Sequence, residues 1–265
     1  MPKRCVRFNG NRDKTMTVKE YFEVNSKAAI AFSGGVDSAY LLYAALKAGA
    51  DVKAYYVRSV FQPQFEFEDA KRVAEMTGCS LSVIEADVLS DERVASNPKD
   101  RCYYCKQHIM SAITSAAAED GYDIVCDGTN ASDDAADRPG FRALGEYGVR
   151  SPLRECGLTK ADIRKASKEA GLPTWNKPAY ACLATRILTG EAITEEKLCV
   201  TEKAESILFD MGFRDFRVRM RGNSALVQIE ESQHEDAVKH EEEIREALSE
   251  LYDEVKIDGS PRISR

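Results

Sequence analysis

The sequence lacks any apolar run of roughly 18 residues or more, and its amino-terminal residues lack the hydrophobic stretch of a signal peptide. These two absences argue against a membrane-spanning or an exported protein, so we expect a cytoplasmic one. An excess of positive charge is also missing, because 37 Lys and Arg residues stand against 44 Asp and Glu residues, for a net charge of -7. Without a bulk attraction to nucleic acids or anionic membranes, the chain favours a small-molecule substrate.

Internal repeats and low-complexity segments are missing as well, and 265 residues suffice for one or two domains with a buried core. Eight cysteines are present at irregular spacing. Because there is no export signal, this spacing argues against a disulfide framework. It favours thiols that serve a metal, a cluster or catalysis.

Residues 33–38 read Ser-Gly-Gly-Val-Asp-Ser, between an apolar strand-like run at 28–32 and a helix-like run at 39–48. Gly34 and Gly35 allow the backbone to turn tightly and to approach an oxyanion. The donors in this segment are the free N-H groups at the helix start and the hydroxyls of Ser33 and Ser38. We call residues 33–38 the nucleotide loop, because this pattern predicts a phosphate cradle.

Asp37 indicates the kind of phosphate ligand. Its carboxylate would repel a bare phosphate, so it fits best with a Mg²⁺ ion that bridges it to the phosphate oxygens. No Lys follows in the manner of a Walker loop, so a different class of nucleotide loop is expected. The alternative is an ordinary strand, turn and helix, with Gly in the turn and Ser as the N-cap.

Strand-like runs at 52–57, 81–85 and 123–127 alternate with helix-like runs near 66–77 and 104–119. This alternation predicts an α/β fold with a parallel sheet. Ligands of such sheets bind beyond the carboxyl ends of the strands, where the nucleotide loop and the segment 127–130, with Gly128, both lie. We therefore expect these two segments to face one cleft. A long loop at 131–152, a helix that starts at Thr159 with a capping box to Asp162 and closes near Gly171, and a second loop at 173–193 complete this part.

Beyond Thr194 the pattern predicts a smaller α+β domain, with domain bounds of 1–190 and 191–265. Its expected elements are a helix to residue 211, strands at 213–220 and 224–230, a helix at 233–251 and a strand at 254–257. Arg217, Arg219 and Arg221 alternate onto one face of the first strand. Either this face binds phosphate or carboxylate, or it is a solvated edge protected by charge.

Cys102 and Cys105 stand three apart at the start of a helix-like run, and Cys182 lies in the second loop, free to fold back onto the same cleft. Three thiolates could ligate three irons of a 4Fe-4S cluster and leave the fourth iron open. From the residues alone, a structural zinc site that uses Cys102, Cys105, His108 and Cys182 is an equal alternative, and a simple redox pair is a further one. The other thiols have no partner at ligand spacing and are expected to have no role: Cys5, Cys79, Cys126, Cys156 and Cys199.

Several independent runs carry a family resemblance. They are 33–38, 97–106, 127–130, 137–140, 151–153, 157–160, 163–164 and 178–186. The nucleotide loop resembles that of the PP-loop ATP pyrophosphatases, and all the runs together resemble the LarE family, ATP-dependent sulfur insertases of nickel-pincer nucleotide biosynthesis. The resemblance implies a PP-loop (adenine nucleotide α-hydrolase-like) domain that uses ATP and Mg²⁺.

The resemblance also implies a reaction. A carboxylate of pyridinium-3,5-biscarboxylic acid mononucleotide is adenylated, and sulfur from sulfide or another donor then displaces AMP to give a thiocarboxylate. Cys182 matches the family's sulfur-bearing cysteine. With Cys102 and Cys105 it matches the subgroup that holds a 4Fe-4S cluster as sulfur carrier, whereas in a sacrificial version Cys182 would donate its own sulfur once.

Other site residues follow from the resemblance. Glu205 is a candidate to orient or transfer protons, while Arg217 and Arg219 are candidates to bind substrate, as is Arg186 in the cysteine-bearing loop. Where the family commonly has a serine, this chain has Thr185. The family implies a homo-oligomer. The alternatives are a PP-loop enzyme that thiolates tRNA, or an ATP sensor or iron-sulfur scaffold without turnover.

Overall fold

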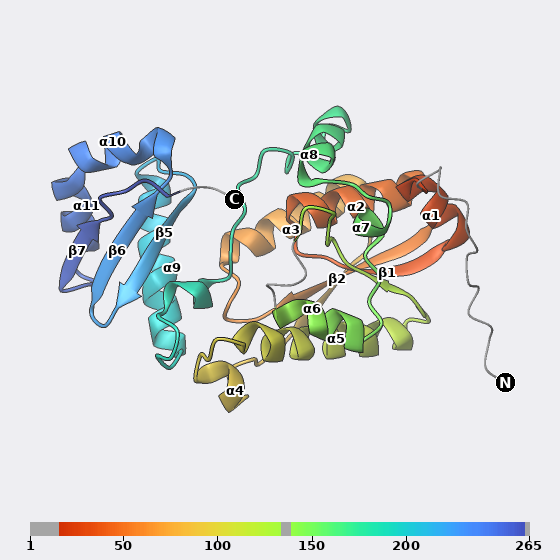
Figure 1. The fold of residues 1–265 in the computed structure, drawn as a ribbon, viewed down its shortest axis with the longest axis horizontal. Coiled ribbons are helices and arrows are strands. Elements are labelled where there is room, and N and C mark those ends of the chain that lie inside the picture. The colour runs from red at the N-terminus through yellow and green to blue at the C-terminus, as the bar shows by residue number, and fades with distance from the viewer. Residues whose placement is uncertain (1–15, 134–138, 263–265) are drawn as a thin grey trace.

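The computed structural model describes residues 16–133 and 139–262 (Figure 1). Its larger sheet has four strands in the order β3-β2-β1-β4, and all neighbouring pairs are parallel. The α/β fold class with a parallel sheet is therefore confirmed. The strands are β1 Lys27–Ala31, β2 Asp51–Arg58, β3 Leu81–Glu85 and β4 Val125–Cys126.

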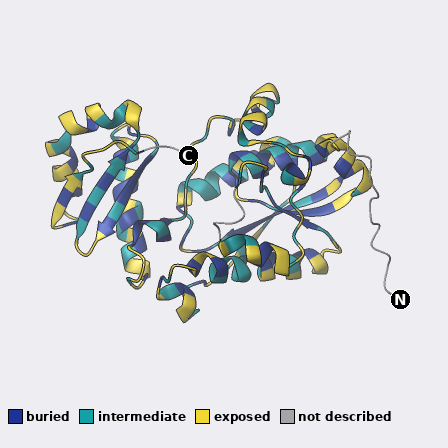
Figure 2. Cartoon of the chain, in the orientation of Figure 1, coloured by how far each residue is buried: buried dark blue, intermediate teal, exposed yellow. Residues whose placement is uncertain are grey.

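Helices cover both faces of this sheet. Side chains of a strand alternate between the two faces, so Ala28 and Ile30 of β1 pack on one side and Ala29 on the other. Burial on both faces explains the apolar residues of β1 and of the middle of β2, whereas the edge strand β3 is only partly buried. Figure 2 shows buried residues along the central strands and exposed residues on the outer surfaces of the helices. The first side holds α1 Val18–Val24, α2 Val36–Lys47 and α3 Gln64–Thr77, and the second holds α5 Arg101–Glu119 and α6 Pro139–Glu146.

A second sheet has three strands in the order β5-β6-β7 and its own apolar core. β5 and β6 are antiparallel and join through a turn at Gly222, whose φ of 57° suits glycine, while β7 is parallel to β6. All these elements follow residue 190, and the domain boundary itself stays a prediction. They are α9 Glu195–Asp210, β5 Phe216–Arg221, β6 Ser224–Ile229, α10 Glu231–Lys239, α11 Glu241–Leu248 and β7 Glu254–Ile257.

Short elements complete the connections. Thr159 caps α8 and forms the predicted reciprocal capping box with Asp162. No helix in the described ranges is both long and apolar enough to cross a membrane. The short elements are α4 Glu92–Ala95, α7 Pro152–Glu155, α8 Lys160–Glu169 and the 3-10 helix η1 Leu183–Arg186.

The structure corrects several expected elements. The prediction of a single helix at 233–251 is wrong, because α10 ends before His240 and α11 begins after it. The first turn of α11 has three consecutive glutamates, and the helix dipole favours acidic groups at that end. The stretch 131–152 is not a continuous loop, since it contains α6 and the start of α7. β5 begins at Phe216 rather than at 213, because Asp215 adopts a positive φ of 43°. Asp137, Arg138 and Cys5 lie outside the described residues.

Candidate active site

The nucleotide loop lies at the carboxyl end of β1 and runs into α2. Gly34 has a φ of 71°, and a Cβ atom there would lie 2.8 Å from Ala70 Cβ, so the turn needs glycine. Gly35 is different: its φ of -80° suits any residue, and it serves as the N-cap of α2 without a side-chain hydrogen bond. The hydroxyls of Ser33 and Ser38 lie 3.1 Å apart, so both predicted side-chain donors line the same loop.

Asp37 meets a partner that the sequence did not predict. Its Oδ2 accepts a hydrogen bond from Lys160 Nζ at 2.6 Å. Among the described residues its Oδ1 is buried without a hydrogen-bond partner. Burial raises the pKa of Asp37, and Lys160 acts in the opposite direction. A carboxylate with one unpaired buried oxygen beside a phosphate cradle has the chemistry of a Mg²⁺ ligand.

The segment after β4 lies against the nucleotide loop, as expected. A Cβ atom on Gly128 would lie only 2.8 Å from the backbone nitrogen of Ser38, so the two segments touch through backbone. Asp127 Oδ2 accepts from Thr129 Oγ1 at 2.6 Å, and its Oδ1 accepts from Ser151 Oγ at 2.7 Å. These bonds hold the segment against Ser151, the residue before α7.

A cavity of about 400 Å³ links this edge of the sheet to Cys102. Asp127 and Thr129 line one part, and Cys102, Lys106 and Phe141 line another. One cavity is thus lined by a thiol and by the strand end that touches the nucleotide loop.

Cys102, Cys105 and Cys182, which we call the thiol group, come together although 80 positions of sequence separate the first from the last. Arg101 Nη2 lies 3.5 Å from Cys102 Sγ and 3.9 Å from Cys182 Sγ. Cys105 and Cys182 pack against the same apolar cluster. Burial, together with the neighbouring thiols, raises the pKa of Cys105 to about 12. Burial also raises the pKa of Cys182, and Arg101 opposes this shift.

The fit of the thiol group to a metal depends on the kind of centre. Across the described residues, no three or more His, Cys, Asp or Glu side chains are arranged to hold a metal ion. A single ion with Zn–S bonds of about 2.3 Å needs its sulfurs closer together than a four-iron cluster does. His108, the additional ligand of the zinc alternative, is bound to Asp91 Oδ2 at 2.8 Å. Three thiols beside the buried cation of Arg101 are a donor set that an anionic metal-sulfur centre could use.

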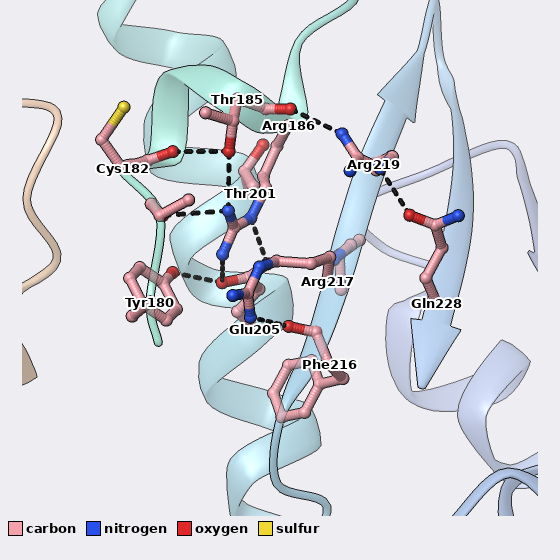
Figure 3. Close-up of polar contacts among 12 residues, drawn as sticks. Tyr180, Cys182, Thr185, Arg186, Thr201, Glu205, Phe216, Arg217, Arg219 and Gln228 are labelled. Atoms are coloured by element: carbon pink, nitrogen blue, oxygen red, sulfur yellow. Dashed lines mark hydrogen bonds and ion pairs between the residues drawn. The ribbon is translucent and has the colours of Figure 1, made fainter. Parts of the chain in front are cut away.

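Arg186 and Glu205 form a buried ion pair between the cysteine-bearing loop and α9 (Figure 3). They are 1% and 2% exposed, and the pair is bidentate, with Arg186 Nε 2.7 Å from Oε1 and Nη2 3.1 Å from Oε2. Glu205 also accepts from the Tyr180 hydroxyl and from the backbone N-H of Val218. Both side chains are therefore bonded within the chain, and Figure 3 shows the Cys182 sulfur pointing away from them.

Arg217 and Arg219 lie on β5 against the same loop. Arg217 is 5% exposed, donates to Ala179 O and Phe216 O, and lies 5.1 Å from the Tyr180 ring centre. Arg219 donates to Thr185 O at 2.8 Å. A solvated edge does not describe these two side chains, and only Arg221 of the three is exposed. We call Tyr180, Arg186 and Glu205 the arginine joint.

Thr185 provides a hydroxyl at the position where the family commonly has a serine. Its Oγ1 donates to Cys182 O at 2.8 Å and accepts from Arg186 Nη1 at the same distance. The extra methyl group therefore leaves the hydroxyl bonded to the cysteine's own backbone.

No protein-family model matches the chain. An uncharacterised protein of Synechocystis sp. is 34% identical over 227 residues, which cover 85% of each chain. A protein of Lactiplantibacillus plantarum named pyridinium-3,5-bisthiocarboxylic acid mononucleotide synthase is 33% identical over 227 residues, 85% of this chain and 82% of its own length. The chain belongs to the LarE family. A tRNA-specific 2-thiouridylase MnmA of Clostridium botulinum is 29% identical over 56% of this chain.

Membership in the LarE family confirms the resemblance seen in the sequence. With the more distant thiouridylase it identifies an ATP-dependent enzyme that transfers sulfur and has a PP-loop fold. Sequence reasoning missed Arg101, Lys160 and Tyr180 as members of the site. All three fall inside runs that carry the family resemblance, so position in those runs was the signal that could have found them.

Proposed function

We propose that this enzyme converts the carboxylates of pyridinium-3,5-biscarboxylic acid mononucleotide to thiocarboxylates. The identity to the L. plantarum synthase over most of both chains carries the proposal. The geometry supports it, because Cys102 of the thiol group lines one cavity with the strand end that touches the nucleotide loop. A carboxylate has a poor leaving group, so activation by ATP and displacement by sulfur require both sites to be adjacent.

In the first step the substrate carboxylate attacks the α-phosphorus of ATP and pyrophosphate leaves. The backbone N-H groups at the start of α2 and the hydroxyls of Ser33 and Ser38 would hold the phosphates, with Gly128 allowing the close approach of the second segment. Asp37 would hold Mg²⁺ through its unpaired oxygen. Lys160, now bonded to Asp37, would keep the local charge balanced before the metal nucleotide enters.

In the second step sulfur attacks the carbonyl carbon of the acyl adenylate and AMP leaves with the bonding electrons. Cys102, Cys105 and Cys182 would hold the 4Fe-4S cluster, which supplies a sulfur atom at its open iron from sulfide or another donor. The half-buried position of Cys182 would limit the access of water, which hydrolyses the adenylate.

Arg217 and Arg219 are the residues proposed to bind the anionic groups of the substrate. Burial, Arg186 and Arg262 lower the pKa of Arg217 to about 10, and burial with Arg186 and Arg221 lowers that of Arg219. Positive charge therefore exceeds negative charge on this face, and a phosphate or carboxylate would relieve the excess. For Arg186 and Glu205 we propose a positioning role, since each is bonded to the other. A cytoplasmic homo-oligomer remains part of the proposal.

Thiolation of tRNA is less well supported. The thiouridylase matches only 56% of the chain, and the net charge of -7 offers no general attraction to RNA.

The test is to incubate anaerobically purified protein with Mg-ATP, sulfide and the biscarboxylic acid mononucleotide. We expect substrate-dependent pyrophosphate and AMP, and a product that gains one and then two sulfur atoms in exchange for oxygen by mass spectrometry. Pyrophosphate release that requires tRNA instead of the mononucleotide would refute the proposal.

A further inference from the structure

Arg101 occupies an unusual position for a charged side chain. It is the first residue of α5 and is 6% exposed. Its Nη1 donates to Asn97 Oδ1 at 2.7 Å and to Ala184 O at 3.0 Å, which joins the start of α5 to the loop that carries Cys182. Its Nη2 is directed at the sulfurs of Cys102 and Cys182.

The charge of Arg101 is not balanced by a carboxylate. In the described part of the chain no Asp or Glu oxygen lies within 4.0 Å of its guanidinium, whereas the similarly buried Arg186 has Glu205 at 2.7 Å. A buried charge without a counter-ion costs several kcal/mol, so such groups are normally paired. The groups that Arg101 contacts are neutral oxygens and two sulfurs, and only the sulfurs can become anionic.

The apolar surroundings make this imbalance more costly. The guanidinium carbon of Arg101 lies 5.9 Å from the ring centre of Phe61, which belongs to the same buried apolar cluster as Leu183 and Ala184. Attraction to one aromatic ring contributes only about 0.5–2 kcal/mol and does not replace a counter-ion. The site therefore has a fixed positive charge directed at the thiols, in a region of low dielectric.

We propose that Arg101 is the counter-ion of the sulfur centre, holding two of its thiol ligands in place and compensating its negative charge. The proposal rests on the proposed function, because a cluster bound by three thiolates is the source of that charge. A positive charge beside the cluster stabilises its reduced, more negative form. Loss of that charge therefore lowers the reduction potential.

A purely structural arginine would behave differently. The bonds of Nη1 to Asn97 and Ala184 tie two segments together, and a neutral donor could make them. A lysine in place of Arg101 would keep the charge but lose the planar fork, whereas a glutamine there would keep a donor but lose the charge. The substitutions Arg101→Lys and Arg101→Gln thus separate charge from scaffolding.

The experiment uses the full chain, reconstituted anaerobically with iron and sulfide, as the native protein and as Arg101→Lys, Arg101→Gln and Arg93→Gln. Arg93 is an exposed arginine on α4 that pairs with Asp91, so its loss is the matched control. Iron and sulfide content and the midpoint potential of the cluster are measured for each. We expect Arg101→Gln to raise the ratio of oxidised to reduced cluster at a fixed potential by about tenfold. This corresponds to a midpoint potential lower by about 59 mV. Arg101→Lys and Arg93→Gln stay near the native value.

Failure to assemble the cluster in Arg101→Gln but not in Arg101→Lys also supports the proposal. A native midpoint and native iron content in Arg101→Gln overturn it, as does equal loss of cluster in both Arg101 variants, and the proposed function survives either result. Absence of iron from the reconstituted native protein refutes the cluster itself and the role of Arg101 with it.

Discussion

The arginine joint and the neighbouring edge of the sheet balance their charges in opposite ways. In the joint, Arg186 and Glu205 are buried and paired with each other, and Tyr180 adds a third bond. At the edge, Asp37 has a buried oxygen without a partner among the described residues, and Arg101 has no carboxylate among them. The joint is complete as it stands, whereas the edge has polar groups available to a metal nucleotide and a sulfur centre.

This difference separates residues that act in the reaction from residues that stabilise the fold. Arg186 and Arg101 both contact the loop around Cys182, yet only Arg101 directs its charge at sulfur. Substitutions in the joint should therefore change stability first, and substitutions at the edge should change turnover at nearly constant stability.

The largest effect is expected for Cys182→Ser at the edge. The variant keeps the nucleotide loop, so substrate-dependent adenylation measured by ATP–pyrophosphate exchange stays near native, while thiocarboxylate formation falls roughly 100-fold or more because the sulfur centre is lost. Cys199→Ser, which removes an exposed thiol from α9, is the control and keeps full activity. Normal thiocarboxylate formation by Cys182→Ser would remove the thiol group from the mechanism.

The second effect is on stability and tests the joint. Glu205→Gln leaves Arg186 buried without its counter-ion, so the free energy of unfolding in urea should fall by about 3 kcal/mol or more. Glu235→Gln, which changes an exposed glutamate in the middle of α10, should change it by less than about 0.5 kcal/mol. If Glu205→Gln instead lowers kcat at unchanged stability, Glu205 acts in catalysis and the contrast between the two regions is wrong.

The third effect concerns the contact of the two loops. In Gly128→Ala the added Cβ would lie 2.8 Å from Ser38 N, so the nucleotide loop must shift, and kcat/KM for ATP should fall about 10-fold or more. Gly145→Ala is the control, because no atom lies within 4 Å of a Cβ built there. Equal ATP kinetics for both variants would show that the loop position is not critical.

The smallest expected effect is the difference in stability between losing a hydrogen-bonded hydroxyl and losing one without a partner among the described residues. Tyr180→Phe removes the hydrogen bond to Glu205 and should lower the free energy of unfolding by about 1.5 kcal/mol. Tyr56→Phe removes a buried hydroxyl that has no partner among the described residues, so it should leave stability unchanged or raise it slightly. Equal losses in the two variants would argue against the network around Glu205.

Much of the fold could be predicted from the sequence because its signals are local. β3 and β7 occur at the predicted bounds of 81–85 and 254–257, and the capping box of Thr159 marks the start of α8. Prediction from the local pattern failed where the interruption of a helix depends on tertiary context, as at His240. It also failed where a short helix, α6, lies in a Gly- and Asp-rich stretch. Helix α1 was not predicted, although Thr17 and Glu20 form a capping box at its start.

The site was predictable in its residue types but not in its contacts. The nucleotide loop and the three thiols follow from spacing and family resemblance. The bond between Asp37 and Lys160 joins residues 123 positions apart, and the contact between Arg101 and Cys182 spans 81 positions. No periodicity encodes such pairings, because they depend on how the loops after different strands meet at one edge of the sheet.

The most direct test of the sulfur-carrier mechanism is the intact mass of the protein after turnover, measured together with the number of thiocarboxylates formed per chain. With sulfide in excess we predict several thiocarboxylates per chain and an unchanged mass with Cys182 intact. One thiocarboxylate sulfur per chain, with the protein lighter by the elements of hydrogen sulfide at Cys182, would contradict the account and show that the enzyme donates its own sulfur.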